Sequence, residues 1–410
     1  MPNQQDRTQR TYRLELQRAV ASGILESAAQ TFLILIAISW FHAPRTAKGF
    51  LASGIYGGLL FTPALVSFVS RRGWRPTAAA ARIALIGAIV FLITLLIPRL
   101  EIFILAGMIA NACATTPTPL MTQVYQENYP YHCRGQLYSR TVAVRIATVA
   151  LAGWIGGRLL EWDFRLYRLL LLLWILAFLH AANCYRRIPS SPLRNDTQAH
   201  PFQALRYVLR HPLFRTTLLS WMIMGFGNLM MLPLRVEYLA NPKYHLTFSP
   251  EEVALFVSVL PSLVRLVATQ LWGWLFDHIN FFLLRILLNL CFAAATITFF
   301  FSRTPLGFYI GAILYGLSSG GGDVAWGLWV TRFAPPSRTA IIMAVHTFLT
   351  GTRGLIAPHV GFQLAGILSI HTLALIGTGM ILFAAALLIP LIPVDRQYAR
   401  PSERGTVSED

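Results

Sequence analysis

The chain has 410 residues, of which 55% are hydrophobic and only 12% are charged. This charged share is about half that of an ordinary soluble protein, and a soluble fold could not bury so much apolar surface. The net charge of +17 does not indicate nucleic-acid binding, because the arginines stand at the ends of apolar blocks and form no separate basic domain. No CxxC pair, metal-ligand cluster, nucleophile motif or phosphate-binding glycine loop is evident. The sequence therefore predicts a membrane protein without a cofactor that is neither an enzyme nor an ATP-driven pump.

In chain order, a polar leader at residues 1–18 is followed by twelve apolar blocks of roughly 20 residues, the length that crosses the hydrocarbon core as a helix. A polar linker, residues 188–212, divides the blocks into two sets, and a polar tail occupies residues 394–410. The blocks are 19–41, 49–69, 78–97, 102–125, 137–160 and 167–185, then 214–234, 253–276, 283–301, 306–330, 340–363 and 372–392. We expect an all-α fold of two pseudo-symmetric six-helix bundles, at residues 19–187 and 213–393.

The arginines also predict the orientation of the chain. They are concentrated in the leader, the linker and alternate loops, so both termini are expected in the cytoplasm and the protein in a bacterial inner membrane. The loop with Arg158, Arg165 and Arg168 is an exception, because this orientation places it outside. In the linker, the helical spacing of residues 202–210 places the apolar side chains on one face and the polar side chains on the other. This pattern predicts a short amphipathic helix on the cytoplasmic surface.

Matching features recur in the two halves at a nearly constant offset. Arg134 precedes the fifth block, and Arg338 precedes the eleventh block 204 residues later. The proline-containing segment 111–119 and the glycine-rich segment 315–323 lie at equal distances before these arginines. Proline and glycine both weaken helices, so we expect the fourth and tenth helices to be interrupted at the same depth. Such paired interruptions indicate a transporter binding site, although a packing kink or a close helix contact is the alternative.

Charged side chains inside the apolar blocks supply candidate binding residues. Each costs a few kcal/mol in hydrocarbon, so they normally face water or one another. In the functional interpretation Glu26 and Asp323 take up a proton and the arginines hold the solute; alternatively, these residues are buried ion pairs that fix helix register. Three arginines against two carboxylates favour an anionic or zwitterionic solute. The candidates are Glu26, Gln30, Asn111, Thr115, Arg145, Asn228, Arg265, Tyr315, Asp323 and Arg353.

Two six-helix halves joined by a long central loop resemble the major facilitator superfamily over nearly the whole chain. The family's loop motif G-x-x-x-D-R-x-G-R-R follows the second helix of each half. It is kept in part here, as Gly273 and Asp277 in the second half and as Arg71 and Gly73 in the first. The resemblance implies that these residues gate the cytoplasmic side together with Arg134, whose helix Asp277 is expected to cap.

The resemblance also assigns the central cavity to helices 1, 4, 7 and 10. Glu26, Asn111, Asn228 and Asp323 fall on these helices. The fifth helix lacks the proline of the antiporter motif, so a drug–proton antiporter is not specifically supported. The subfamily is not identified.

We therefore predict a secondary active transporter that carries a small solute by alternating access. A proton is the expected coupling ion, since no dense cluster of oxygen ligands for sodium is apparent. The expected partners are the solute and the lipid bilayer, with the monomer as the working unit. The rival interpretation is a transporter-like membrane sensor or scaffold without transport activity.

Overall fold

The computed structural model describes residues 4–130, 133–193, 210–246, 248–333 and 336–393, and within these ranges the regular structure is entirely helical. The first half comprises α1 Gln4–Ser27, η1 Ala28–Phe32, α2 Leu33–Ser39, α3 Arg45–Arg71, α4 Pro76–Leu96, α5 Leu100–Thr115, α6 Thr118–Asn128, α7 Arg134–Trp162, η2 Phe164–Leu166 and α8 Tyr167–Arg187. The second comprises α10 Pro212–Met231, α11 Leu234–Ala240, η3 Pro242–Tyr244, α12 Pro250–Ala254, η4 Leu255–Val259, α13 Leu260–His278, α14 Phe281–Phe301, α15 Pro305–Phe333, α16 Pro336–Leu364, α17 Ile370–Ala386 and η5 Ile389–Leu391.

Joined across their short breaks, these helices make twelve membrane crossings in two bundles, which confirms the predicted fold class. Among the described residues, nine helices are apolar and long enough to cross a membrane on composition alone, and α3, bent by 46°, is a tenth. The other two crossings, α15 and α16, are 29 residues long. Their hydropathy is reduced by polar residues, among them Asp323 and Arg353.

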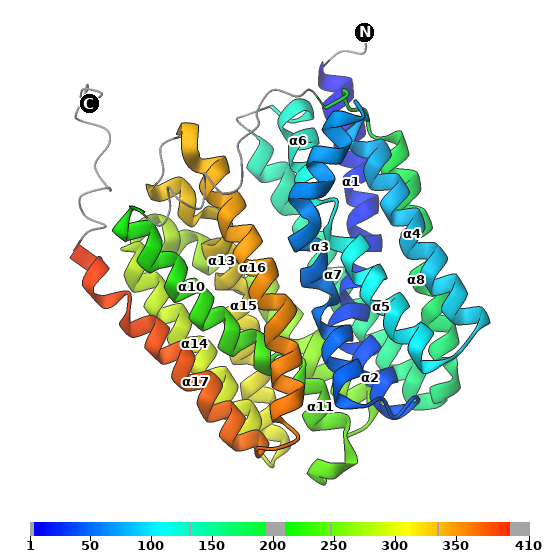
Figure 1. The fold of residues 1–410 in the computed structure, drawn as a ribbon, viewed down its shortest axis with the longest axis vertical. Coiled ribbons are helices and arrows are strands. Elements are labelled where there is room, and N and C mark those ends of the chain that lie inside the picture. Colours follow the sequence, from blue (N-terminus) through cyan, green and yellow to red (C-terminus); the bar gives the residue numbers. More distant parts are fainter. Residues whose placement is uncertain (1–3, 131–132, 194–209, 247, 334–335, 394–410) are drawn as a thin grey trace.

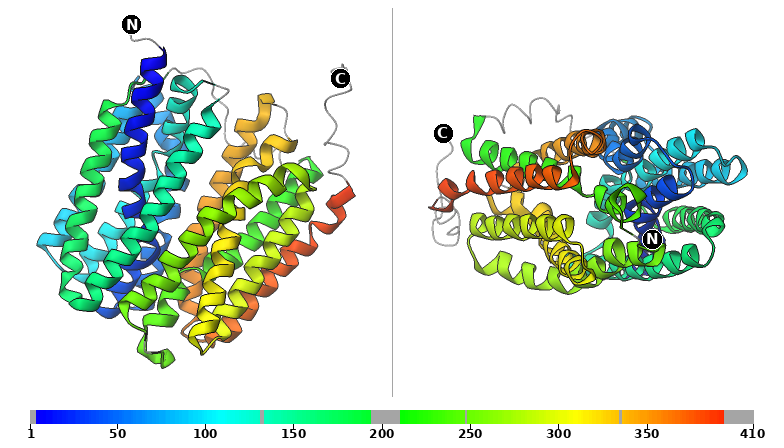
Figure 2. Two further views of the ribbon diagram at one scale, coloured as in Figure 1. Left: turned by 180° about the vertical axis from the view of Figure 1, so that it is seen from behind. Right: turned by 90° about the horizontal axis from the view of Figure 1, so that it is seen from below.

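The two bundles lie side by side (Figures 1 and 2). We call the end at which α1 begins the terminal side, and the other end the opposite side. In Figure 1 the ribbons of the halves diverge toward the terminal side and meet at the opposite side. Contacts between the halves include α3 against α16 and α7 against α12 and α13.

Glycines allow close helix contacts at equivalent places in the two halves. A Cβ atom on Gly23 of α1 would lie 2.5 Å from the carbonyl oxygen of Arg145 on α7. A Cβ atom on Gly225 of α10 would lie 2.2 Å from the guanidinium carbon of Arg353 on α16. The first contact is with backbone, so Gly23 sets how closely α1 approaches α7. The second is with the end of a flexible side chain, so Gly225 leaves room for the Arg353 guanidinium group against α10.

The interruption predicted in the fourth crossing is present, but the one predicted in the tenth is wrong. A break at Thr116 and Pro117 separates α5 from α6, whereas α15 is continuous through its glycines. Cβ atoms on Gly316 and Gly320 would lie within 2.5 and 2.9 Å of α13 backbone atoms. These glycines therefore allow close packing on α13 and do not break α15.

Three further irregularities were not predicted, although Pro233 at the break between α10 and α11 is a sequence signal for one of them. The first crossing contains the π-helical turn η1 just after Glu26, and the eighth contains η4 just before α13. The seventh crossing breaks between α10 and α11. π-Helical turns inside longer helices are often found at functional sites.

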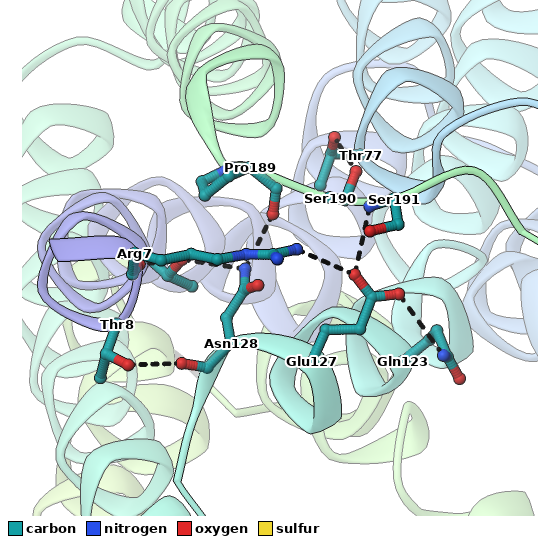
Figure 3. A network of polar contacts seen from close by, with 10 residues as sticks. Arg7, Thr8, Thr77, Gln123, Glu127, Asn128, Pro189, Ser190 and Ser191 are labelled. Carbon is teal, nitrogen blue, oxygen red and sulfur yellow. Dashed lines mark hydrogen bonds and ion pairs between the residues drawn. The ribbon is translucent and has the colours of Figure 1, made fainter. Parts of the chain in front are cut away.

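Both ends of the first half are packed onto its helices where the structure describes them. From Gln4 onward the leader is part of α1. Figure 3 shows the start of the linker tied to this half by polar contacts. Asn128 donates to the Pro189 carbonyl at 2.8 Å, and Glu127 accepts from Arg7 at 3.1 Å and from the Ser191 N–H at 3.1 Å. Most of the predicted amphipathic segment, residues 202–209, lies outside the described residues.

Candidate functional site

Four of the candidate residues form a continuous chain of ion pairs between the halves. Arg145 of α7 donates to Glu26 of α1 at 2.9 Å, and Glu26 accepts from Arg265 of α13 at 3.0 Å. Arg265 also holds Asp323 of α15 with two bonds of 2.6 and 3.0 Å. The order is Arg145–Glu26–Arg265–Asp323, with equal numbers of positive and negative groups. Gln30 donates to Glu26 at 2.9 Å and so belongs to the same group.

The packing of the helices positions this chain. Gly23 lets α1 approach α7, which brings Glu26 beside Arg145, and Gly320 lets α15 approach α13 at Arg265. Because Glu26 belongs to the first half and Arg265 to the second, their bond crosses the interface between the bundles. The outer members Arg145 and Asp323 are 34% and 39% exposed, and the inner members only 17% and 13%. Water therefore reaches the ends of the chain more easily than its centre.

The other candidate residues lie elsewhere. Asn111 and Thr115 donate to the carbonyl groups of Leu51 and Ile55, and so tie α5 to α3 inside the first half. Asn228 and Tyr315 line a water-sized cavity of about 10 Å³ in the second half. Arg353 donates to the Trp221 carbonyl and lies within electrostatic range of Tyr56 on α3. The structure thus brings five of the ten candidates together and separates the rest.

Three arginines of the second half are buried without a carboxylate partner among the described residues: Arg235, Arg285 and Arg353, at 5%, 1% and 6% exposed. Arg235 stacks on Tyr315, 3.6 Å from the ring centre, and Arg285 stacks on Trp221 at 3.4 Å. A charged side chain in the membrane core costs about 2.5–3.5 kcal/mol, and a desolvated cation–π contact contributes about 2 kcal/mol. Stacking therefore offsets only part of the cost of burying Arg235 and Arg285.

The opposite side carries a second set of ion pairs between the halves. Lys48 of α3 bonds Glu237 of α11 at 2.6 Å, and both side chains are at most 5% exposed. Lys243 lies 3.8 Å from the same carboxylate; burial lowers the pKa of Lys243, while Glu237 acts in the other direction. Sequence reasoning missed this cluster. The sequence did contain one signal for it, because only two of the 34 basic residues are lysines. Both of these lysines lie beside Glu237 in the structure.

A more exposed pair accompanies the lysines on this side. Arg158 of α7 bonds Glu251 of α12 at 3.0 Å, with the arginine 65% exposed. Glu251 thus balances the charge of Arg158, one of the three arginines in the loop that was an exception to the positive-inside rule.

The predicted gating residues lie on the terminal side, and those whose side chains the structure describes make no bond to the other half. Arg71 ends α3, and Gly73 adopts a positive φ of 60° in the turn that follows. Gly273 and Asp277 lie in the last turns of α13, where Asp277 is exposed and has no polar contact with another described residue. Among the described residues the N-cap residue of α7, Cys133, makes no side-chain cap bond, and the capping of α7 by Asp277 stays a prediction. The Arg134 side chain lies outside the described residues.

The arrangement is suited to binding and to conformational change. Within the described ranges, no three His, Cys, Asp or Glu side chains are grouped as metal ligands. The mid-membrane chain offers two carboxylates that can exchange partners, and the arginines offer donors to an anion.

Comparison with known proteins gives matches to a family and to solved structures. The model of the Major Facilitator Superfamily matches residues 19–358. The crystal structure of the nucleoside transporter NupG is similar, with a TM-score of 0.72 and 14% identity over 94% of this chain and 98% of that one. A D-xylose-proton symporter gives 0.67 and 17% over 96% and 98%, and the human organic anion transporter MFSD10 gives 0.66 and 13% over 95% and 100%. A sequence search of curated proteins gives no match.

Proposed function

The chain belongs to the major facilitator superfamily, and on this premise we propose that it is a secondary active transporter of a small anionic or zwitterionic solute. It carries this solute across the cytoplasmic membrane by alternating access, as a monomer, because both halves of the site come from one chain. The observation that carries the proposal is the Arg145–Glu26–Arg265–Asp323 chain. A bond between the halves at mid-membrane must break or rearrange whenever the halves move apart there.

The balance of buried charge supports an anionic solute. The four-residue chain is neutral, and Arg235, Arg285 and Arg353 add three positive charges with no carboxylate partner among the described residues. An uncompensated cation in low dielectric favours entry of a negative group. The similar solved structures include a nucleoside transporter, a D-xylose-proton symporter and an organic anion transporter; of these, the last agrees with this charge balance.

Proton coupling is proposed to act through Asp323. Glu26 is held by two arginines and Gln30, whereas among the described residues Asp323 is bonded by Arg265 alone and is the more exposed carboxylate. When Asp323 binds a proton, its carboxylate loses its charge and its ion pair with Arg265 breaks. Arg265 is then free to bind the solute, while its remaining bond to Glu26 keeps its side chain oriented.

The orientation is proposed from the arginines, with the terminal side in the cytoplasm. The ion pairs of Glu237 and Glu251 then join the halves on the outer side. In this orientation the structure corresponds to a conformation closed to the outside. Asp277 would meet the first half only in the alternate conformation.

The proposal is tested by reconstituting the protein in liposomes that contain a pH-sensitive dye. Each member of a panel of small carboxylates is added under an imposed solute gradient. We expect the wild type to move protons with at least one of them, and Asp323→Asn to lose proton movement while retaining solute exchange. Normal proton-coupled uptake by Asp323→Asn would contradict the role of Asp323. A folded wild type that moves no solute would favour the sensor or scaffold.

A further inference from the structure

Trp221 of α10 lies at the centre of a buried polar cluster in the second half. Arg285 of α14 stacks on its ring at 3.4 Å, and the ring of His346 lies 5.2 Å away. Arg353 of α16 donates to the Trp221 carbonyl. The two guanidinium groups are close enough to interact electrostatically. Three helices thus place two arginines and a histidine around one tryptophan.

Many polar atoms of this cluster have no hydrogen-bond partner among the described residues. They include both terminal nitrogens of Arg285, Nε of Arg353, Nε2 of His346 and both side-chain polar atoms of Asn289, one turn beyond Arg285. Each of these four side chains is more than nine-tenths buried. Buried donors are normally satisfied, so a group of them in one place indicates a bonding partner that the chain itself does not supply.

The first half shows how this chain satisfies a buried arginine. Arg18 bonds both oxygens of Glu15, at 2.8 and 2.7 Å, and also contacts Ser22, Tyr125 and Tyr185. Arg285 and Arg353 have no such carboxylate within reach among the described residues. The charge of Arg18 is therefore balanced by a carboxylate within the chain, whereas the charges of Arg285 and Arg353 are not.

We propose that this cluster binds a small oxyanion between Arg285 and Arg353, held by their N–H groups and by Asn289 and His346. Guanidinium groups suit the planar, two-oxygen geometry of a carboxylate and also bind phosphate. The inference goes beyond the proposed function, because this oxyanion site is separate from Arg265, the cation proposed to receive the transported solute. The Trp221 ring positions Arg285 by stacking.

The test is a titration of the purified full-length protein, with thermal unfolding as the readout. The probes are acetate, inorganic phosphate and the neutral analogue acetamide, at constant ionic strength set with sodium chloride. An oxyanion that binds only the folded protein raises the Tm, and acetamide does not. An acetate effect identifies a carboxylate as the ligand, whereas an effect of phosphate alone identifies a phosphate group.

Arg285→Gln and Arg353→Gln are each expected to raise the titration midpoint by about tenfold to hundredfold, the effect of losing a charge-assisted hydrogen bond. Arg215→Gln, an exposed arginine on α10, is the matched control and should behave as wild type. Asn289→Leu keeps both charges and should also weaken binding. The Asn289→Leu variant therefore still tests oxyanion binding if an arginine variant does not fold.

A stability comparison separates a binding role from a structural one. Without oxyanion, Arg285→Gln should not lower the Tm, because it removes an uncompensated charge. Arg18→Gln should lower it, because Glu15 is then buried without its partner. A similar loss in both variants, or an oxyanion shift that survives Arg285→Gln and Arg353→Gln, would overturn the proposal. The readout needs no transport, so a protein that binds oxyanions but moves no solute would refute only the proposed function.

Discussion

Replacing Lys48 with methionine is expected to shift the protein strongly toward a conformation that is open at the opposite side. The variant leaves Glu237, which is 2% exposed, without its closest cation. Breaking a buried ion pair by removing one partner costs about 3–5 kcal/mol, which corresponds to a change of roughly two to four orders of magnitude in a conformational equilibrium. Opening this side lets Glu237 reach water, so that conformation avoids most of the cost.

The shift can be measured as a distance between spin labels at Trp162→Cys and Ile367→Cys, with the four native cysteines replaced. These positions are 85% and 81% exposed on the opposite side, one in each half. Arg158→Gln is the matched control, since it breaks a solvent-exposed pair across the same interface and such pairs contribute about 0–1 kcal/mol. The double variant Lys48→Met/Glu237→Leu should return toward the wild-type distance. An unchanged distance in Lys48→Met would show that the pair does not hold this side closed.

Replacing Arg265 with glutamine is expected to abolish both proton-coupled uptake and solute exchange. Arg265 makes three charge-assisted bonds, two to Asp323 and one to Glu26, and is the cation proposed to receive the solute. Losing such bonds costs about 1.5–3 kcal/mol each, so transport should fall by at least about a hundredfold. Asp323→Asn, in contrast, keeps the arginine and should lose only the coupling to protons.

Both variants are compared in the same liposomes by solute counterflow and by proton movement. Arg265→Lys preserves the charge without the two-pronged geometry and should recover a small part of the exchange. Arg215→Gln again serves as the control for an arginine outside the site. If Arg265→Gln exchanged solute at the wild-type rate, the ion-pair chain would have only a structural role.

The fold was largely predictable because hydrophobic length is a direct requirement of the bilayer. Pro117 correctly predicted a break, because proline lacks a backbone N–H and so weakens a helix whatever its neighbours are. The glycines of α15 predicted a break that is absent, because glycine can also serve to let two helices pack closely. Gly316 and Gly320 serve that purpose against α13, and sequence alone does not separate the two uses.

The site was less predictable, because pairing between halves depends on tertiary contacts. Residues at helical spacing on one helix, such as Glu26 and Gln30, could be grouped correctly. Arg235 and Arg285 were missed because they lie near the ends of apolar blocks, where arginines usually mark a membrane interface. In the structure both are buried. Lys48 was missed for the same reason.

The scarcity of lysine gives this transporter a built-in chemical reporter. Amine-reactive acylating reagents can modify just two side chains in the sequence, and Lys48 is 4% exposed while the Lys243 side chain is 35% exposed. Lys243 therefore supplies an internal reference for reagent access, and Lys48 becomes reactive only when its contact with Glu237 opens. The ratio of the two modified peptides in a mass spectrum measures the occupancy of each conformation in native membranes, without an introduced cysteine or spin label.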